Sequence, residues 1–223
     1  LMDAPAVARA TAGASINLSN AQTLDAVNLH VDTTGVINLG SLAMFRNASA
    51  IADGGNLNLA GVTDFDDSAI LVSAGSEIVL GTASDYSRQA DADGDARAFL
   101  ATGPGSALRF PALTTITQTE TGTPVDAALT IAATDAGTVG MPALTSISGG
   151  AVQMSAIGSN SVVDCAALAS WTASNPGTPS SLVAESGGVV RLNSLSAVTG
   201  VDVTLPAGGT IRVPQLFTVA NAN

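Results

Sequence analysis

The residues whose types and spacing best suit chemistry lie in one acidic segment, SRQADADGDARAF, at residues 87–99. Three aspartates alternate there around Gly94, and Asp85 shortly precedes them. Alternating carboxylates at a glycine bend can direct several oxygen atoms at one cation, and Ca²⁺ prefers such ligands. The segment predicts either a calcium site or an acidic loop exposed to solvent. The calcium ligands would be Asp91, Asp93 and Asp95.

Two further polar segments, TQTETGTPVD at 117–126 and TASNPGTP at 172–179, add hydroxyl and amide groups. Such groups hydrogen-bond to sugars, and arginine pairs with carboxylates. We therefore expect these segments and the acidic one to carry any specific binding, with a glycan as the possible partner. The candidate binding residues are Asp85, Arg88, Arg97, Thr119, Thr121 and Asn175.

The residue inventory argues against several kinds of catalysis. His30 is the single histidine and the chain has no lysine, so a histidine metal cluster is excluded and a Ser-His-Asp triad is not expected. Cys165 is the only cysteine, which excludes an intrachain disulfide. Because it occupies an apolar position of a repeat, we expect a buried small hydrophobe rather than a nucleophile. No catalytic residue is assigned.

The elements that must position these segments are revealed by a repeat that recurs nine times, as in GGTIRVPQLFTV and GGVVRLNSLSAV. The steps between the central apolar residues are 21, 20, 21, 30, 31, 24, 27 and 21 residues. Units of this size indicate a stacked array. The central residues are Leu18, Leu39, Leu59, Leu80, Phe110, Met141, Cys165, Leu192 and Val213.

Each repeat contains short apolar stretches rather than a helix-length pattern. Residues two before the central one are apolar too, which indicates a strand with one buried face, and a small residue two positions earlier suits a tight corner. Further apolar columns follow at three and six residues past the centre. The pattern predicts an all-β, single-stranded parallel β-helix (solenoid) of about nine coils, with 20–21 residues per basic coil.

This fold makes further expectations possible. The column six residues past the centre, which we call the third column, contains four aromatic residues: Phe45, Phe65, Tyr86 and Trp171. We expect them to stack inside the solenoid rather than form a sugar-binding surface. Asparagines that recur on the outward side of the central strand suggest amide ladders or a solvated stripe. A leucine-rich repeat is the alternative, but the segments between strands are too short and too β-prone for a helix in each unit.

The three largest insertions all leave from the corner that follows the third column. Residues 87–97, 117–126 and 172–179 stand where the most regular coil has only Thr199 and Gly200. Insertions in solenoids gather on one face, which is often the binding face. We therefore expect one expanded corner. Asp64, Asp66 and Asp67, at the unexpanded corner of the preceding coil, would approach the acidic cluster at residues 91–95 from one coil below.

Composition limits the partners. The formal charge is −11 and only 7 residues are basic, which argues against nucleic acid and anionic membrane surfaces. No apolar run is long enough to span a membrane, so membrane insertion is not expected. The chain begins at Leu1, and we expect residues 1–223 to form a single β-solenoid domain that belongs to a longer protein.

Across residues 13–220, the small-residue-rich, acidic, cysteine-poor coils resemble the passenger and adhesin repeats of bacterial surface proteins. The resemblance implies a non-catalytic extracellular or cell-surface module, such as a stalk, matrix or surface-layer component. Its partners would be more coils of the same protein or a self-associating subunit. The alternative is a pectate-lyase-like polysaccharide lyase or hydrolase, in which the acidic segment and Arg88 or Arg97 would act.

Overall fold

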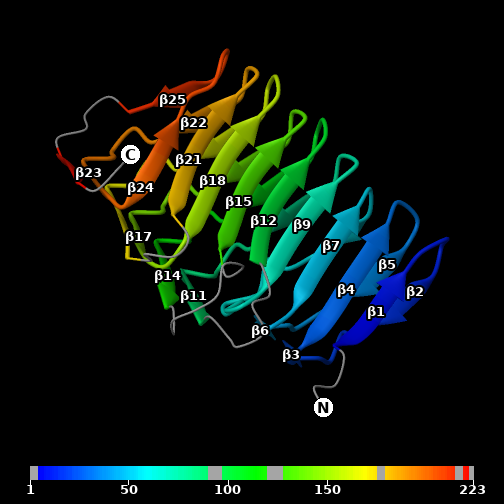
Figure 1. Cartoon of the computed structure of the whole chain (residues 1–223). Helices are drawn as coiled ribbons and strands as arrows, with labels where there is room; N and C mark the ends of the chain where they lie inside the picture. Colours follow the sequence, from blue (N-terminus) through cyan, green and yellow to red (C-terminus); the bar gives the residue numbers. More distant parts are fainter. Residues whose placement is uncertain (1–4, 90–96, 120–127, 175–178, 214–217, 221–223) are drawn as a thin grey trace.

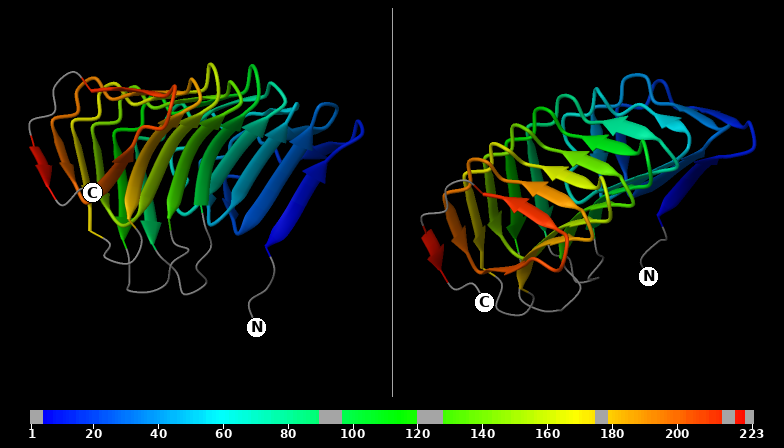
Figure 2. Two further views of the ribbon diagram at one scale, coloured as in Figure 1. Left: turned by 45° about the horizontal axis from the view of Figure 1, so that its top comes forward. Right: turned by 90° about the horizontal axis from the view of Figure 1, so that it is seen from above.

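The computed structural model is an all-β solenoid whose strands stack in parallel, coil upon coil (Figures 1 and 2). It describes residues 5–89, 97–119, 128–174, 179–213 and 218–220. No helix occurs in these ranges, so the leucine-rich repeat is excluded for the described chain. The predicted fold class is confirmed.

The first face is one continuous nine-stranded sheet in which every coil supplies one strand. Its strands are β1 (Ala6–Ala10), β4 (Val27–Asp32), β7 (Ser49–Asp53), β9 (Ala69–Ser73), β12 (Arg97–Thr102), β15 (Leu129–Thr134), β18 (Val152–Ile157), β21 (Ser180–Glu185) and β24 (Val201–Thr204).

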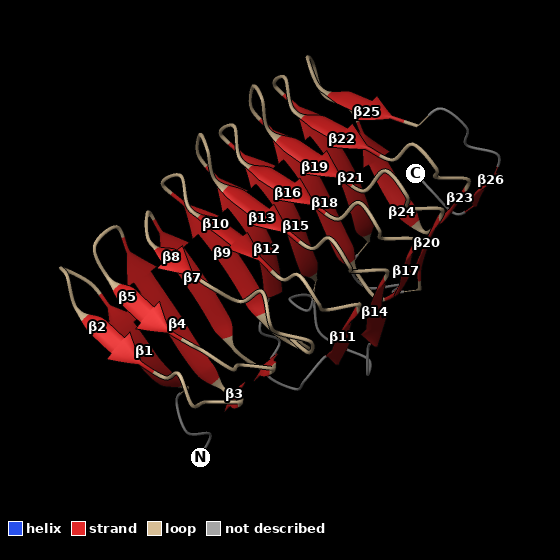
Figure 3. Cartoon of the chain, turned by 180° about the vertical axis from the view of Figure 1, so that it is seen from behind, coloured by secondary structure: helices blue, strands red, loops and turns tan. Residues whose placement is uncertain are grey.

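The second face, in front in Figure 3, holds the predicted central strands but is divided into two sheets. The three-stranded sheet contains β2 (Ser15–Asn17), β5 (Val36–Asn38) and β8 (Asn56–Leu57). The six-stranded sheet contains β10 (Glu77–Val79), β13 (Ala107–Arg109), β16 (Thr138–Gly140), β19 (Val162–Asp164), β22 (Val189–Arg191) and β25 (Thr210–Arg212).

The third face also has two sheets. The first pairs β3 (Thr23–Asp25) with β6 (Met44–Arg46). The second contains β11 (Asp85–Gln89), β14 (Thr115–Thr119), β17 (Ser146–Gly149), β20 (Ser170–Ala173), β23 (Ala197–Thr199) and β26 (Thr218–Ala220). The strands group into nine coils; coil 2 holds β4–β6, coil 3 holds β7 and β8, and coil 4 holds β9–β11.

The register matches the columns read from the repeat. Ile78 pairs with Leu108 on the second face, and Tyr86 pairs with Ile116 on the third. The inward side chains form one hydrophobic core that runs from Ala10 to Val201. Because neighbouring coils bury each other's apolar face, no coil needs a core of its own.

The predicted interior aromatic residues are buried as expected, and a ring cluster lies at coils 3 to 5. The Phe65 and Tyr86 ring centroids are 4.9 Å apart, and Phe110 lies 5.5 Å from Phe65. Phe99 from the first face completes the cluster, 4.9 Å from Tyr86. Trp171 and Cys165 are fully buried, so a role as an exposed stacking surface or an accessible thiol is excluded for them. Burial also raises the pKa of the Cys165 thiol.

The predicted small residue at the corner between the first and second faces has a packing reason. A Cβ atom added to Gly188 would lie 2.1 Å from the carbonyl oxygen of Ala156 in the previous coil. Gly35 is equally close to Ala10, at 1.9 Å. Glycine here lets adjacent coils approach to the inter-strand spacing of ~4.8 Å.

Candidate functional site

The three insertions leave from one corner, as predicted. They connect β11 to β12, β14 to β15 and β20 to β21, so all three pass from the third face to the first. Five predicted residues lie outside the described residues, and their roles in calcium or glycan binding stay predictions. They are Asp91, Asp93, Asp95, Thr121 and Asn175.

The described candidates at this corner face in different directions. Asp85 is exposed and accepts a hydrogen bond from the Ser84 hydroxyl at 2.9 Å. Thr119 is exposed at the end of β14. Arg97 is half-buried, and its Nε donates to the carbonyl oxygen of Asp67 at 2.5 Å.

Arg88 is only 2% exposed, so its side chain lies inside the solenoid rather than on the outer surface. It stands opposite Gln118 of the next coil, which is also 2% exposed. Strand alternation explains both placements, because Arg88 follows the inward Tyr86 by two residues and Gln118 follows the inward Ile116 by two. That spacing was available in the sequence and would have indicated an inward polar pair.

The acidic residues of coil 3 lie one coil below the expanded corner, and their predicted approach to residues 91–95 falls outside the described residues. Asp66 accepts a hydrogen bond from the Ser87 amide at 2.7 Å, and partial burial raises the pKa of its carboxyl. Asp64 forms an ion pair with Arg46, which lowers the pKa of that carboxyl. In the described part of the chain, no group of three or more His, Cys, Asp or Glu side chains is arranged to hold a metal ion.

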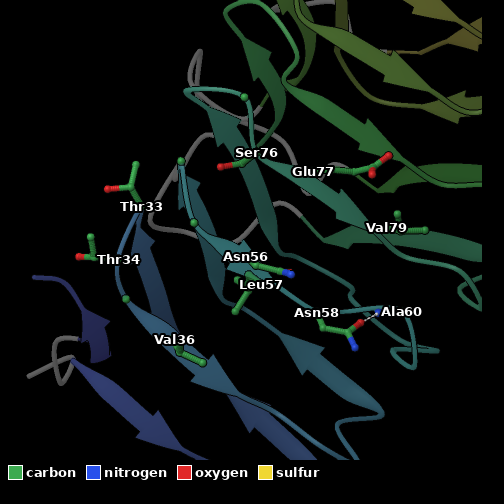
Figure 4. A pocket seen from close by; sticks show the side chains of 14 residues that line it. Thr33, Thr34, Val36, Asn56, Leu57, Asn58, Ala60, Ser76, Glu77 and Val79 are labelled. Atoms are coloured by element: carbon green, nitrogen blue, oxygen red, sulfur yellow. Dashed lines mark hydrogen bonds between the residues drawn. The ribbon is translucent and has the colours of Figure 1, made fainter. Parts of the chain in front are cut away.

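A second candidate site, which the sequence reasoning missed, is a groove of about 650 Å³ on the second face (Figure 4). It is lined by residues of coils 2, 3 and 4, and we call it the coil 3 groove. Its polar side chains are Thr33, Thr34, Asn56, Asn58, Ser76 and Glu77, and Val36 and Val79 add apolar surface.

The groove has a simple origin in chain length. Between the last inward residue of the first face and the first inward residue of the second, coil 2 has five residues (32–36) and coil 4 has five (73–77). Coil 3 has only four, 53–56. The shorter corner explains why β8 has just two residues and why the surface is recessed there. The 20-residue step between Leu39 and Leu59 records this deletion in the sequence.

The short corner also interrupts the ladder, because β8 pairs with β5 but not with β10. In coils 1 and 4 to 8, the amide of the central residue donates to the next coil, as Leu80 does to Arg109 at 2.9 Å. Among the described residues, the corresponding bonds from the Leu59 amide to Val79 and from the Glu77 amide to Gly55 are not formed. Three of the four residues in these missing bonds, Gly55, Glu77 and Val79, line the groove.

The side chain of Ser76, which lines the same groove, also lacks a hydrogen-bond partner. Its hydroxyl is buried without a hydrogen-bond partner, and the residue is 4% exposed. At the equivalent position of the next coil, Ser106 Oγ accepts from the Gly75 amide at 3.0 Å and donates to the Thr102 carbonyl at 2.7 Å. Figure 4 shows the Ser76 oxygen directed toward the Thr33 side of the groove.

The outward asparagines on this face do not form the amide ladder suggested by their register. Asn17 Oδ1 accepts from the Ser19 amide, and Asn58 Oδ1 accepts from the Ala60 amide, each at 3.0 Å. The side chains thus close turns within their own coil. Further along the column, Arg191 pairs with Asp164 at 3.1 Å.

No protein-family model, curated protein or solved structure matches this chain. No helix in the described ranges is long and apolar enough to cross a membrane. Function must therefore be argued from the two candidate sites and the scaffold itself.

Proposed function

We propose that this chain is a non-catalytic structural or adhesive β-solenoid module that acts outside the cell or at its surface, as a stalk, matrix or surface-layer component. The observation that supports it most is the continuity of the core and of the nine-stranded sheet through every coil. At ~4.8 Å per coil, nine coils make a rod about 43 Å long. Such a rod can separate and present other parts of a protein.

The surface positions also suit a passive rod. Exposed hydroxyls at the corner between the second and third faces bond to the backbone of the preceding coil. Thr114 Oγ1 donates to the Ser84 carbonyl at 2.9 Å, and Thr145 Oγ1 donates to the Thr114 carbonyl at 3.0 Å. Because these hydroxyls are engaged in hydrogen bonds between coils, their role is to stabilise the stack rather than to bind a substrate.

The partner in this proposal is further coils of the same protein or a second copy that stacks head to tail. Within the described residues, β1 pairs only with β4, and β24 pairs only with β21. Apolar side chains lie exposed at both ends: Val7 is 66% exposed, Val203 47% and Leu205 56%. Unpaired strand edges with exposed apolar residues are templates for pairing with another chain.

Sedimentation velocity over a wide concentration range tests this. We expect concentration-dependent association that Val203→Asp reduces, because a carboxylate would be desolvated in the stacked interface. The matched control is Ile157→Asp, since Ile157 is similarly exposed, at 37%, but lies in β18, which is paired on both sides. A monomer at every concentration, or equal effects of both variants, would contradict self-association.

The expanded corner remains the proposed place for calcium or a glycan in such a module, through the acidic segment and the accessible Asp85 and Thr119. Turnover of a polysaccharide by the purified chain would overturn the non-catalytic proposal and favour the lyase or hydrolase. A panel of acidic and neutral polysaccharides, assayed for new reducing ends and for unsaturated products, distinguishes these cases.

A further inference from the structure

We propose that the coil 3 groove binds a neutral saccharide of one or two sugar rings. This site lies on a different face from the expanded corner and does not depend on the module's role as a scaffold. Its volume of about 650 Å³ falls within the range of about 300–1,000 Å³ that is typical of small-ligand sites.

The Ser76 hydroxyl is the first observation that points to a ligand. Buried hydroxyls are normally hydrogen-bonded, and the equivalent Ser106 and Ser161 each have two partners. Ser76 has none. A ligand hydroxyl in the groove would provide the missing partner.

The second observation that points to a ligand is the interrupted backbone ladder between β8 and β10. The Glu77 amide lacks its ladder acceptor, the Gly55 carbonyl, and the Val79 carbonyl lacks its ladder donor, the Leu59 amide. Gly55, Glu77 and Val79 line the groove. The groove thus combines donors with acceptors over a short distance. A sugar hydroxyl both donates and accepts, so it suits this mixture better than a group that only accepts.

The charges favour a neutral ligand. Glu77 is the only acidic residue in the lining, and its Oε1 accepts from Arg109 Nε at 2.5 Å. No basic residue lines the groove, so a phosphate or an acidic sugar would find no counter-charge there. Among the described residues the Asn56 side chain forms no hydrogen bond, and Asn58 keeps its amide NH₂ group available because only its oxygen is engaged.

The ends of the groove favour a compact ligand over an extended peptide. At one end the Gly54 amide donates to the Ser73 carbonyl at 3.1 Å, and at the other Thr82 Oγ1 donates to the Ala60 carbonyl at 3.3 Å. These bonds join coils 3 and 4 on both sides of the gap. A peptide strand that paired with β10 would have to continue past both closures, whereas a sugar ring fits between them. Val36, which is 53% exposed, offers aliphatic contact to its C–H groups.

The test is a titration of the ¹⁵N-labelled chain with neutral mono- and disaccharides of glucose, galactose, mannose and N-acetylglucosamine, followed by amide chemical shifts. We expect saturable shifts at the Glu77 amide and at the Asn56 side chain, both of which belong to the groove lining. Asn56→Ala should weaken binding by roughly threefold to tenfold, the loss expected for one hydrogen bond. Asn38→Ala is the matched control, because Asn38 is exposed on the same face but outside the lining.

Four results would overturn the inference. They are an absence of groove shifts with every neutral sugar, equal weakening by Asn56→Ala and Asn38→Ala, tighter groove binding of an acidic sugar, and groove binding of an extended peptide instead of a sugar. Sedimentation of the unliganded chain is unaffected by these outcomes, so failure of the groove and failure of the scaffold proposal remain distinguishable.

Discussion

Ser76, Ser106 and Ser161 occupy the same position in three coils, but only the last two have hydrogen-bond partners. Ser161 Oγ accepts from the Ala136 amide at 3.0 Å and donates to the Ile157 carbonyl at 2.6 Å. Substitution of each serine by alanine keeps the Cβ atom and removes only the hydroxyl. The three variants therefore isolate the effect of the missing partner at Ser76.

The magnitudes follow from this difference. Ser106→Ala loses two hydrogen bonds and leaves an amide and a carbonyl without their partner, so we expect the free energy of unfolding to fall by about 1–3 kcal/mol. Ser161→Ala should behave alike. Ser76→Ala removes a buried hydroxyl that has no partner, so we expect no loss, or a gain of up to about 1 kcal/mol.

Urea unfolding followed by the fluorescence of Trp171, the only tryptophan, measures all three variants. For a chain of this length, 1 kcal/mol corresponds to about 2–4 °C in Tm, so thermal unfolding provides a second measurement. If Ser76→Ala lost as much stability as Ser106→Ala, the Ser76 hydroxyl would have a partner in solution. That result would refute the inference that the buried Ser76 hydroxyl is unsatisfied in the unliganded chain.

Three other perturbations test the scaffold and the acidic segment. Gly188→Ala should destabilise by about 1–3 kcal/mol through overpacking, whereas Gly140→Ala, whose Cβ would meet no atom within 4 Å, should be neutral or stabilising; equal urea midpoints would contradict this. Hydrogen bonds from backbone amides lower the Asp32 pKa to about 2, so its stabilisation is present above its usual value of 3.8 and is lost as the pH falls towards 2. The urea midpoint of Asp32→Asn should therefore fall less than that of the unmodified chain as the pH is lowered from 3.8 towards 2. Calcium should raise the Tm of the chain but not of Asp93→Ala, and an equal rise in both would exclude Asp93 as a ligand.

Much of the fold was predictable because its determinants are local. The inward columns follow from the alternation of side chains along a strand, and stacking repeats that cannot bury their own apolar face forces them into one core. The common corner of the three insertions followed from counting residues between columns. The inward direction of Arg88 was equally open to prediction, since it is separated from Tyr86 by two residues, but its type suggested an exposed binding role.

The sequence by itself determined the coil, its period, its buried columns and the position of its insertions. Only the tertiary structure decided which backbone groups of neighbouring coils meet. One residue fewer at residues 53–56 shortens one step of the repeat to 20 residues but leaves the alternation inside coil 3 intact, so the deletion does not show that a ladder is broken. Hydrogen bonds between coils depend instead on the relative placement of two corners about 20 residues apart. A small mismatch between the two corners breaks the hydrogen-bond ladder between β8 and β10 and forms the groove. Hydrogen bonds need a narrow range of distances and angles, whereas hydrophobic burial tolerates a small displacement of the two strands.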